Sequence, residues 1–342
     1  MKPRQKIVLF VLRNTPLLLF AAVFILFGLL APRFLHWESL QNIVKQASYI
    51  GIVAVGMTAV LLTAGIDLSV GSTMYVSAIV AGLLINNHSV SVAVALGGCL
   101  AVGTIIGSIN AFFITRLKIL PFIVTLATMV AGRGLGLLLT QSRAVNFPEA
   151  VVRMGSINFL GVLPLPILFF IIVVAAVHLF LNRTQLGRQL YAVGYDQETA
   201  RKAGVPTTQV LATAYVISGF CAALGGFVSV AQLGIVNAGF GKGDEFDAIA
   251  AAVLGGASLF GGIGSVFPGT VIGALMIRMV WSGLVFAQVN LYYQPLIFAA
   301  ILFFAVFLDS VRSRFLTKLR RRNIRMKSNR IDLPAKHTDN PA

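Results

Sequence analysis

The sequence has little charge, and its acidic residues are much scarcer than its basic ones. Only 11% of the 342 residues are charged, whereas 57% are hydrophobic, and the mean hydropathy is +0.88. A soluble domain of this composition would lack the polar side chains needed to cover its surface. The composition therefore excludes a soluble protein and predicts an integral membrane protein.

Cysteine is also scarce, and histidine is scattered. Cys99 and Cys221 both lie in apolar runs and have no paired spacing, which excludes a disulfide framework and a Cys-x-x-Cys site. None of the four histidines has a second ligand type at helical spacing. We therefore expect no metal site and no cofactor.

Motifs for catalysis are missing as well. The chain has no Gly-x4-Gly-Lys-Ser/Thr phosphate loop; the nearest string, residues 240 to 243, lacks the upstream glycine and the hydroxyl residue that would hold Mg²⁺. Nucleophile elbows, zinc-protease signatures and paired carboxylates within spans are also absent. The sequence predicts a protein that is not an enzyme, so that any ATP hydrolysis must come from another chain.

Apolar runs near the ~20 residues needed to cross a bilayer recur along the chain. They predict an all-α, polytopic membrane domain over residues 16–310 with about ten transmembrane helices, at 16–30, 47–64, 68–85, 90–115, 119–140, 163–181, 210–233, 248–260, 266–287 and 291–308. The eighth run reaches only about 20 Å, so we expect a broken or re-entrant helix there, shielded by its neighbours.

The basic residues predict the orientation of this domain. With ten spans, 20 Lys and Arg residues fall on one side and five on the other, which places both termini in the cytoplasm. Residues 1–15 form a cytoplasmic N-terminus, and residues 311–342 form a basic cytoplasmic tail that contacts anionic membrane lipid. Because the +16 net charge lies at the ends and between apolar runs, we expect no nucleic-acid partner.

Small residues predict close helix packing in three spans, through Gly103-x3-Gly107, Gly132-x3-Gly136 and Gly269-x3-Gly273. A weak internal similarity also links residues 59–81 to residues 252–274. It is either a repeat, which transporters often contain, or a coincidence in an alanine- and valine-rich chain.

The largest internal island of charge is residues 182–206, NRTQLGRQLYAVGYDQETARKAGVP. Glu198, Thr199 and Ala200 are followed at an interval of three residues by Gly204. This spacing favours a short helix that ends at the glycine, because glycine readily adopts the left-handed conformation of a helix C-terminus. Such a helix could dock into a partner; the alternative is a solvated loop whose arginines only fix orientation.

This loop resembles the cytoplasmic coupling loop of bacterial ATP-binding-cassette importer permeases, and more closely that of the ribose-type sugar permeases. The matching residues are Thr184, Gly187, Arg188, Tyr191, Ala192, Gly194, Glu198, Ala200, Gly204 and Val205. The chain departs from the pattern at Tyr195-Asp196, where Gly-Asn is usual, at Thr199, which replaces an alanine, and at the shortened end Val205-Pro206.

Two further stretches resemble the same family. Residues 63–72, TAGIDLSVGS, look like its TGGIDLSVGS segment, with Ala64 in place of a glycine. Residues 244–256 and 261–264 look like its DAIAAVVLGG and GGxG block. The matches run in the same order from about residue 50 to residue 285.

The resemblance implies the partners and the function. A cytoplasmic ABC ATPase would bind the coupling loop at about 182–208, a periplasmic sugar-binding protein would deliver a sugar or polyol, and a second permease subunit, identical or paralogous, would complete the pathway in the bacterial inner membrane. Transport would follow alternating access. The implied coupling residues are Arg188, Glu198, Thr199, Ala200, Arg201 and Gly204.

Three polar residues at or inside spans are candidates for the gate or path. Asp67 and Ser69 form either the N-cap region of the third span or part of the cytoplasmic gate. Arg133, in the fifth span, either clamps neighbouring carbonyls or lines a watery path, because an arginine at membrane depth is costly unless it is paired or wet. Arg278 carries the same ambiguity.

Two other functions stay open. A secondary transporter needs carboxylates within its spans, whereas here the acidic residues nearest to spans (Asp67, Asp244, Glu245, Asp247 and Asp309) lie at span ends in the sequence. A membrane scaffold or sensor would use the loop and tail as contact surfaces and would show no uptake defect on deletion.

Overall fold

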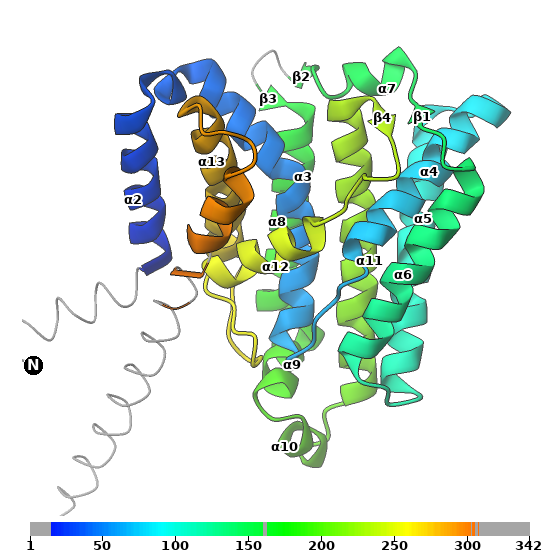
Figure 1. Ribbon diagram of the computed structural model, residues 1–342. Helices are drawn as coiled ribbons and strands as arrows, with labels where there is room; N and C mark the ends of the chain where they lie inside the picture. Colours follow the sequence, from blue (N-terminus) through cyan, green and yellow to red (C-terminus); the bar gives the residue numbers. More distant parts are fainter. Residues whose placement is uncertain (1–14, 160–162, 302, 305–306, 308–342) are drawn as a thin grey trace, which may run out of the picture.

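The computed structural model describes residues 15–159, 163–301, 303–304 and 307, and these form a bundle of helices (Figure 1). The predicted all-α membrane architecture is confirmed. The long helices are α2 (Thr15–Leu30), α3 (Trp37–Leu62), α4 (Val70–His88), α5 (Val92–Thr115), α6 (Pro121–Thr140), α8 (Leu165–Arg183), α11 (Thr207–Leu233) and α13 (Val271–Phe286).

Seven helices of the described part are long and apolar enough to cross a membrane: α3, α4, α5, α6, α8, α11 and the segment Val266–Phe286 that contains α13. The 16-residue α2 is shorter. The tenth predicted span lies only partly among the described residues, and both predicted cytoplasmic ends (1–15 except Thr15, and 311–342) lie outside them. The number of ten spans and the position of the termini therefore stay predictions.

The boundaries agree with the predicted runs within a few residues except at the eighth run, where α12 spans Asp244–Leu254 and not 248–260, and at α3. This helix begins at Trp37, about ten residues before the predicted run at residue 47. Its first turns contain Gln41, Asn42, Lys45 and Gln46, whose polarity hides the helix from a hydropathy reading. The difference places a row of polar side chains on the first half of a helix that crosses the membrane.

The eighth run is the short helix that its length predicts. α12 (Asp244–Leu254) has 11 residues, which at ~1.5 Å per residue span about 16 Å. It lies beside α3 and α13, about midway along the bundle (Figure 1). Short helices at mid-depth occur in membrane proteins where neighbouring helices shield their ends.

The two ends of the bundle carry different short elements. At one end lie the antiparallel pairs of β1 (Val145–Asn146) with β4 (Ile235–Val236) and of β2 (Asn158–Phe159) with β3 (Leu163–Pro164), together with α7 (Glu149–Arg153). At the opposite end lie α9 (Gln185–Tyr195) and α10 (Gln197–Lys202) (Figure 1). The turns η1 (Pro32–Leu35) and η2 (Val266–Thr270) precede α3 and α13.

Helix α11 lies at the centre of the bundle and packs against α3, α4 and α5. The backbones of α11 and α5 lie very close together where α5 has glycines. A Cβ at Gly103 would overlap the Gly219 carbonyl oxygen, and a Cβ at Gly107 would overlap the Tyr215 carbonyl oxygen. The predicted close packing through glycines is therefore confirmed for this pair. Small residues allow such backbone contact in lipid, where apolar side chains gain little by associating.

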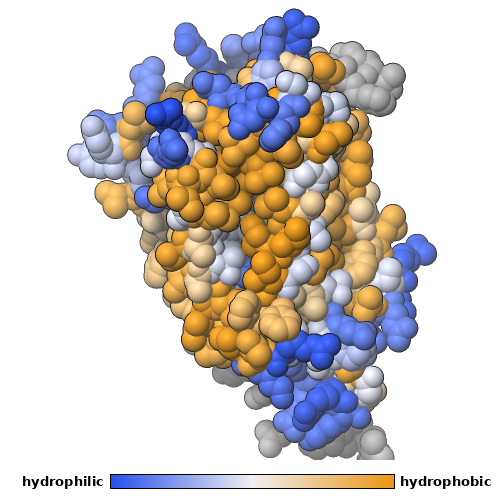
Figure 2. Space-filling model, turned by 90° about the vertical axis from the view of Figure 1, so that its right-hand side faces the viewer, coloured by the Kyte–Doolittle hydropathy of each residue, from blue (hydrophilic) through white to orange (hydrophobic). Residues whose placement is uncertain are grey.

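The surface has a broad apolar zone between polar ends (Figure 2). Large apolar side chains of α2, α5, α6 and α8 are exposed there. A surface of this kind suits the hydrocarbon of a bilayer, with the polar ends in water.

Candidate functional site

The residues of the predicted coupling loop fold into α9 and α10. Thr184 begins α9, because its side-chain oxygen accepts a hydrogen bond of 3.0 Å from the Gly187 amide. Asp196 begins α10 in the same way, accepting from the Thr199 amide at 2.9 Å. This bond, together with a further bond from the Thr199 side chain, holds the pKa of the Asp196 carboxyl below its ordinary value.

The predicted short helix ending at a glycine is confirmed. α10 ends at Lys202, and Gly204 adopts a left-handed conformation with φ of 82°. The Gly204 amide donates to the Arg201 carbonyl at 3.0 Å. Helix α9 was not expected, although Thr184, a good N-cap residue, was a signal for it.

The predicted coupling residues share one exposed surface, apart from Ala200. Glu198 pairs with Lys202 at 2.9 Å and both side chains are largely exposed, as are Arg188, Thr199, Arg201 and Gly204. Ala200 is buried and holds α10 on the bundle. The exposed ion pair contributes little to stability, so these charges are available for a partner.

Two segments interrupt the helices near this surface: residues 63–69 between α3 and α4, called the α3–α4 link, and residues 255–265 between α12 and η2, called the α12–α13 link. Gly194 of α9 touches the end of α3, just before the first link, and the α12–α13 link, since a Cβ there would overlap the Leu62 carbonyl oxygen and lie 2.7 Å from the Gly262 amide nitrogen.

Hydrogen bonds hold the same three elements together. The Gly262 amide donates to the Leu62 carbonyl at 3.0 Å, and the Tyr191 hydroxyl donates to the Gly264 carbonyl at 3.3 Å. Displacement of α9 must therefore move the end of α3 and the α12–α13 link together.

Two large side chains next to the coupling surface are almost fully exposed: Tyr195 is 86% and Phe260 is 90% accessible. A Cβ at Gly262 would lie 3.1 Å from the Tyr195 backbone, so the end of α9 and the α12–α13 link form one surface. Sequence reasoning noted Tyr195 only as a departure from the family pattern and missed Phe260. Exposed apolar groups beside charged ones are typical of protein interfaces.

A cavity of about 680 Å³ lies between α10 and the α3–α4 link. Its walls come from the link, from the adjacent ends of α5, α6 and α11, and from Glu198 and Arg201 of α10. The space separates α10 from the first residues of the α3–α4 link, Thr63 to Gly65.

Asp67 is 1% exposed and joins separate parts of the bundle. Its Oδ1 accepts from the amide of Ser69 at 3.0 Å and from the Ser69 hydroxyl, and its Oδ2 accepts from the Ser218 hydroxyl of α11 at 2.7 Å. The N-cap residue of α4 is Ser69, whose side chain makes no capping bond. The interpretation of Asp67 as an N-cap therefore holds only for the Ser69 amide. Its other carboxylate oxygen, Oδ2, bonds a different helix, α11.

The network continues from Ser69 to two further helices. Asn110 of α5 donates to the Ser69 hydroxyl at 2.9 Å, and Thr128 of α6 donates to the Asn110 amide oxygen at 2.6 Å. Sequence reasoning missed Asn110, Thr128 and Ser218, because single polar residues in apolar spans give no pairing signal. Together they tie the α3–α4 link to α5, α6 and α11.

Arg133 contacts a backbone carbonyl, as the clamp interpretation expects. It donates to the carbonyl of Phe240, which precedes α12, and its guanidinium lies 5.3 Å from the centre of the Tyr75 ring. Its Nη2 and the Glu245 Oε2 are both buried without a hydrogen-bond partner. Both atoms approach Gly71 at the start of α4.

Arg278 of α13 pairs with two acidic residues of α12. Its Nη2 lies 3.7 Å from Asp244 and 3.5 Å from Asp247, and it also donates to the Tyr49 hydroxyl of α3. The sequence places these acidic residues at a span end, but the structure brings them against Arg278, within α13. Carboxylates therefore do lie inside the bundle, contrary to the expectation from the sequence, but both are paired with a cation.

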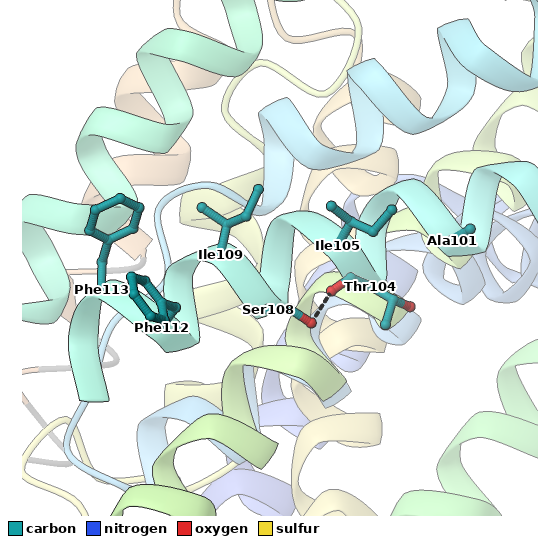
Figure 3. Close-up of a pocket in the computed structure, with 7 residues that line it drawn as sticks. All are labelled: Ala101, Thr104, Ile105, Ser108, Ile109, Phe112 and Phe113. Carbon is teal, nitrogen blue, oxygen red and sulfur yellow. Dashed lines mark hydrogen bonds between the residues drawn. The ribbon is translucent and has the colours of Figure 1, made fainter. Parts of the chain in front are cut away.

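A groove of about 550 Å³ runs along the outer side of α5 and is lined by that helix alone (Figure 3). Most of its lining is apolar, and the Ser108 hydroxyl is already bonded to the Thr104 carbonyl at 2.7 Å. Within the part of the chain that the structure describes, no second element lines it. The groove is part of the apolar outer surface.

Comparison with known proteins agrees with this architecture. Residues 39–306 match the family described as the permease component of the branched-chain amino acid transport system. The ribose import permease protein of Escherichia coli strain K12 is 37% identical over 286 residues, covering 82% of this chain and 88% of that protein. The D-allose transport system permease protein of the same strain is 35% identical over 297 residues, covering 86% and 90%.

A third relative, the ribose import permease protein of Bacillus subtilis strain 168, is 36% identical over 295 residues, covering 84% of this chain and 90% of that protein. No solved structure matches the chain. The resemblance predicted from the sequence is confirmed, and with it a multi-pass location in the membrane. The chain belongs to this family of import permeases.

Proposed function

We propose that this protein is the membrane-spanning subunit of an ATP-driven importer that carries a sugar or a sugar-like polyol by alternating access. The relatives at 35–37% identity are permeases for ribose and allose. The chain has no phosphate-binding loop of its own. A separate cytoplasmic ATPase supplies the energy, a periplasmic sugar-binding protein supplies the cargo, and a second permease subunit completes the path.

The observation that carries this proposal is the contact of α9 with both the end of α3 and the α12–α13 link. A partner that binds the exposed face of α10 acts, through Gly194 and Tyr191, on the end of α3 and on the α12–α13 link. Interfaces are built from exposed apolar side chains with charged residues around them. Tyr195 and Phe260, beside Glu198 and Arg201, have that composition.

In this mechanism ATP binding closes the ATPase, which draws the coupling surface of each permease subunit inward. The α3–α4 link is fixed to α5, α6 and α11 by the Asp67 network, so that movement of the links becomes movement of whole helices. The path then opens toward the periplasm, and hydrolysis resets it. This requires the α9–α10 end of the bundle to face the cytoplasm, as the basic residues predict.

Copurification of the ATPase subunit with the tagged permease tests the proposal. Glu198→Lys and Gly204→Asp, which alter the exposed face and the end of α10, should lower ATPase recovery at least tenfold. Glu149→Lys is the matched control, because Glu149 also forms an exposed i,i+4 pair, with Arg153 at 2.7 Å, at the opposite end of the bundle. Equal recovery for Glu198→Lys and Glu149→Lys would contradict the proposal, as would sugar uptake by the purified chain alone.

A further inference from the structure

A second cavity, of about 430 Å³, lies in the half of the bundle away from α9 and α10. It is lined by α3, α11 and α13 through Asn42, Lys45, Gln46, Tyr49, Ser229, Gln232, Leu233 and Arg278. Its volume is within the ~300–1,000 Å³ of small-molecule sites. All but one of its lining side chains are polar, although all three helices are long and apolar enough to cross the membrane.

Three of these residues form a row along α3. Asn42, Gln46 and Tyr49 are spaced four and three residues apart, so they share one face of the helix. The amides of Asn42 and Gln46 are exposed and make no hydrogen bond within the described residues. Free amide groups on a membrane helix are costly in lipid, and this row must therefore face water or a polar ligand.

Arg278 and Gln232 lie on other helices that line the cavity. Its Nη2 is taken by Tyr49, Asp244 and Asp247, but its Nε is buried without a partner. Gln232 is partly used, donating to the Lys45 carbonyl at 3.1 Å. The cavity therefore has donors and acceptors on facing helices, with the Tyr49 ring between them.

The charges around the cavity select for a neutral ligand. Lys45 and Arg278 carry two positive charges, and the two carboxylates that hold Arg278 balance them. A branched-chain amino acid would need an apolar pocket for its side chain and free charges for its ammonium and carboxylate groups. The lining has one leucine and no free carboxylate.

We propose that this cavity is a binding station for a neutral polyhydroxylated solute, a sugar, on its way through the membrane. The exposed amides of Asn42 and Gln46 bond hydroxyl groups, next to the polar side chains of Lys45, Ser229 and Gln232 that line the same cavity. The inference rests on the proposed function and deepens it, because it places the cargo on α3, the helix whose other end contacts α9.

Thiol protection in cells that express the complete transporter tests this proposal. Gln46→Cys introduces a thiol in the cavity, while both native cysteines are buried. Labelling of Cys at this position by a membrane-impermeant thiol reagent should slow about tenfold at a sugar concentration about ten times its Kd. The sugar is the one that the wild-type transporter takes up fastest from a panel of pentoses and hexoses, and leucine should give no protection.

Asn87→Cys is the control, because Asn87 is exposed on the last turn of α4 and outside the cavity; its labelling should not respond to sugar. Gln46→Leu should lower sugar uptake about five- to tenfold with normal ATPase recovery. If the wild-type transporter takes up sugar but sugar does not protect Gln46→Cys from labelling, and Gln46→Leu transports normally, the proposed binding site in this cavity is wrong. The proposed function would still stand. Uptake of leucine and of no sugar would instead overturn the proposed function.

Discussion

The α3–α4 link and the α12–α13 link approach each other at Ala64 and Gly261, but they are held in different ways. The first contains a buried carboxylate, Asp67, whose hydrogen bonds and those of Ser69 reach α5 and α11 directly. The second contains three glycines with positive φ, Gly256, Gly261 and Gly262, and is held mainly through backbone atoms. The helices on its two sides, α12 and α13, are also joined to each other by the ion pairs of Arg278 with Asp244 and Asp247.

The comparison suggests a division of roles. A link fixed by side-chain bonds to several helices transmits displacement, whereas a glycine-rich link can change shape at low cost. We expect the α3–α4 link to move as one body with α5, α6 and α11. The α12–α13 link should absorb the resulting strain while Arg278 keeps α12 against α13.

The largest effect is expected where α9 touches the end of α3 and the α12–α13 link. Gly194→Ala would place a Cβ into the Leu62 carbonyl and against the Gly262 amide, so the backbone of both segments would have to shift. We expect a loss of stability of about 3 kcal/mol and loss of ATP-dependent uptake, measured by thermal unfolding in detergent and by transport. Gly134→Ala is the control, because a Cβ there has nothing within 4 Å; equal effects of the two changes would contradict the contact.

The next largest effect is expected at the ion pairs across the α12–α13 link. Arg278→Gln removes the cation and leaves Asp244 and Asp247, both mostly buried, without a positive partner. Such a loss typically costs about 3 kcal/mol, visible as a lower melting temperature. The added change Asp247→Asn should restore part of the stability, and a double variant no better than Arg278→Gln would show that the pairs do not hold the link.

A smaller effect is expected at the α3–α4 link. Asp67→Asn keeps an oxygen for Ser69, but its amide nitrogen cannot accept the bond from Ser218. We expect a loss of about 1–2 kcal/mol and weaker coupling between ATP hydrolysis and uptake. When Ser218 is already replaced by alanine, Asp67→Asn should lower the stability by less than it does in the wild type. If Asp67→Asn leaves transport and its coupling to ATP hydrolysis unchanged, Asp67 has only a local structural role.

The smallest effect should be a gain. Ala64 has a φ of 60°, a conformation that glycine adopts without cost. Ala64→Gly, which makes the α3–α4 link more like its glycine-rich counterpart, should therefore raise stability by about 1 kcal/mol. The thermal midpoint measures the gain, and a lower midpoint would show that flexibility in this link costs more than the strain it removes.

Much of the fold could be predicted because lipid requires long apolar helices. The runs gave most helix ends within a few residues, and Gly204 marked the end of α10. α3 began earlier than predicted, because Asn42, Lys45 and Gln46 have the polarity of a loop although they lie on a helix. Hydropathy cannot distinguish a polar loop from a polar helix face.

The candidate site was predictable only in part, for a similar reason. Caps and helix ends are local, so α10 could be predicted from neighbouring residues. Two partners, Ser218 of Asp67 and Phe240 of Arg133, are more than 100 residues away in the sequence. Such pairings depend on which helices become neighbours, and a single sequence does not contain that information.

The short pair of β1 and β4 affects how the bundle can move. β1 follows α6 and β4 follows α11, and their registered residues, Val145 with Val236 and Asn146 with Ile235, fasten these two helices together at one end. Nearer the opposite end the same two helices are joined by side chains, through Ser218, Asp67, Ser69, Asn110 and Thr128. A displacement near α9 should therefore tilt α6 and α11 together about the β1–β4 pair and should not separate them.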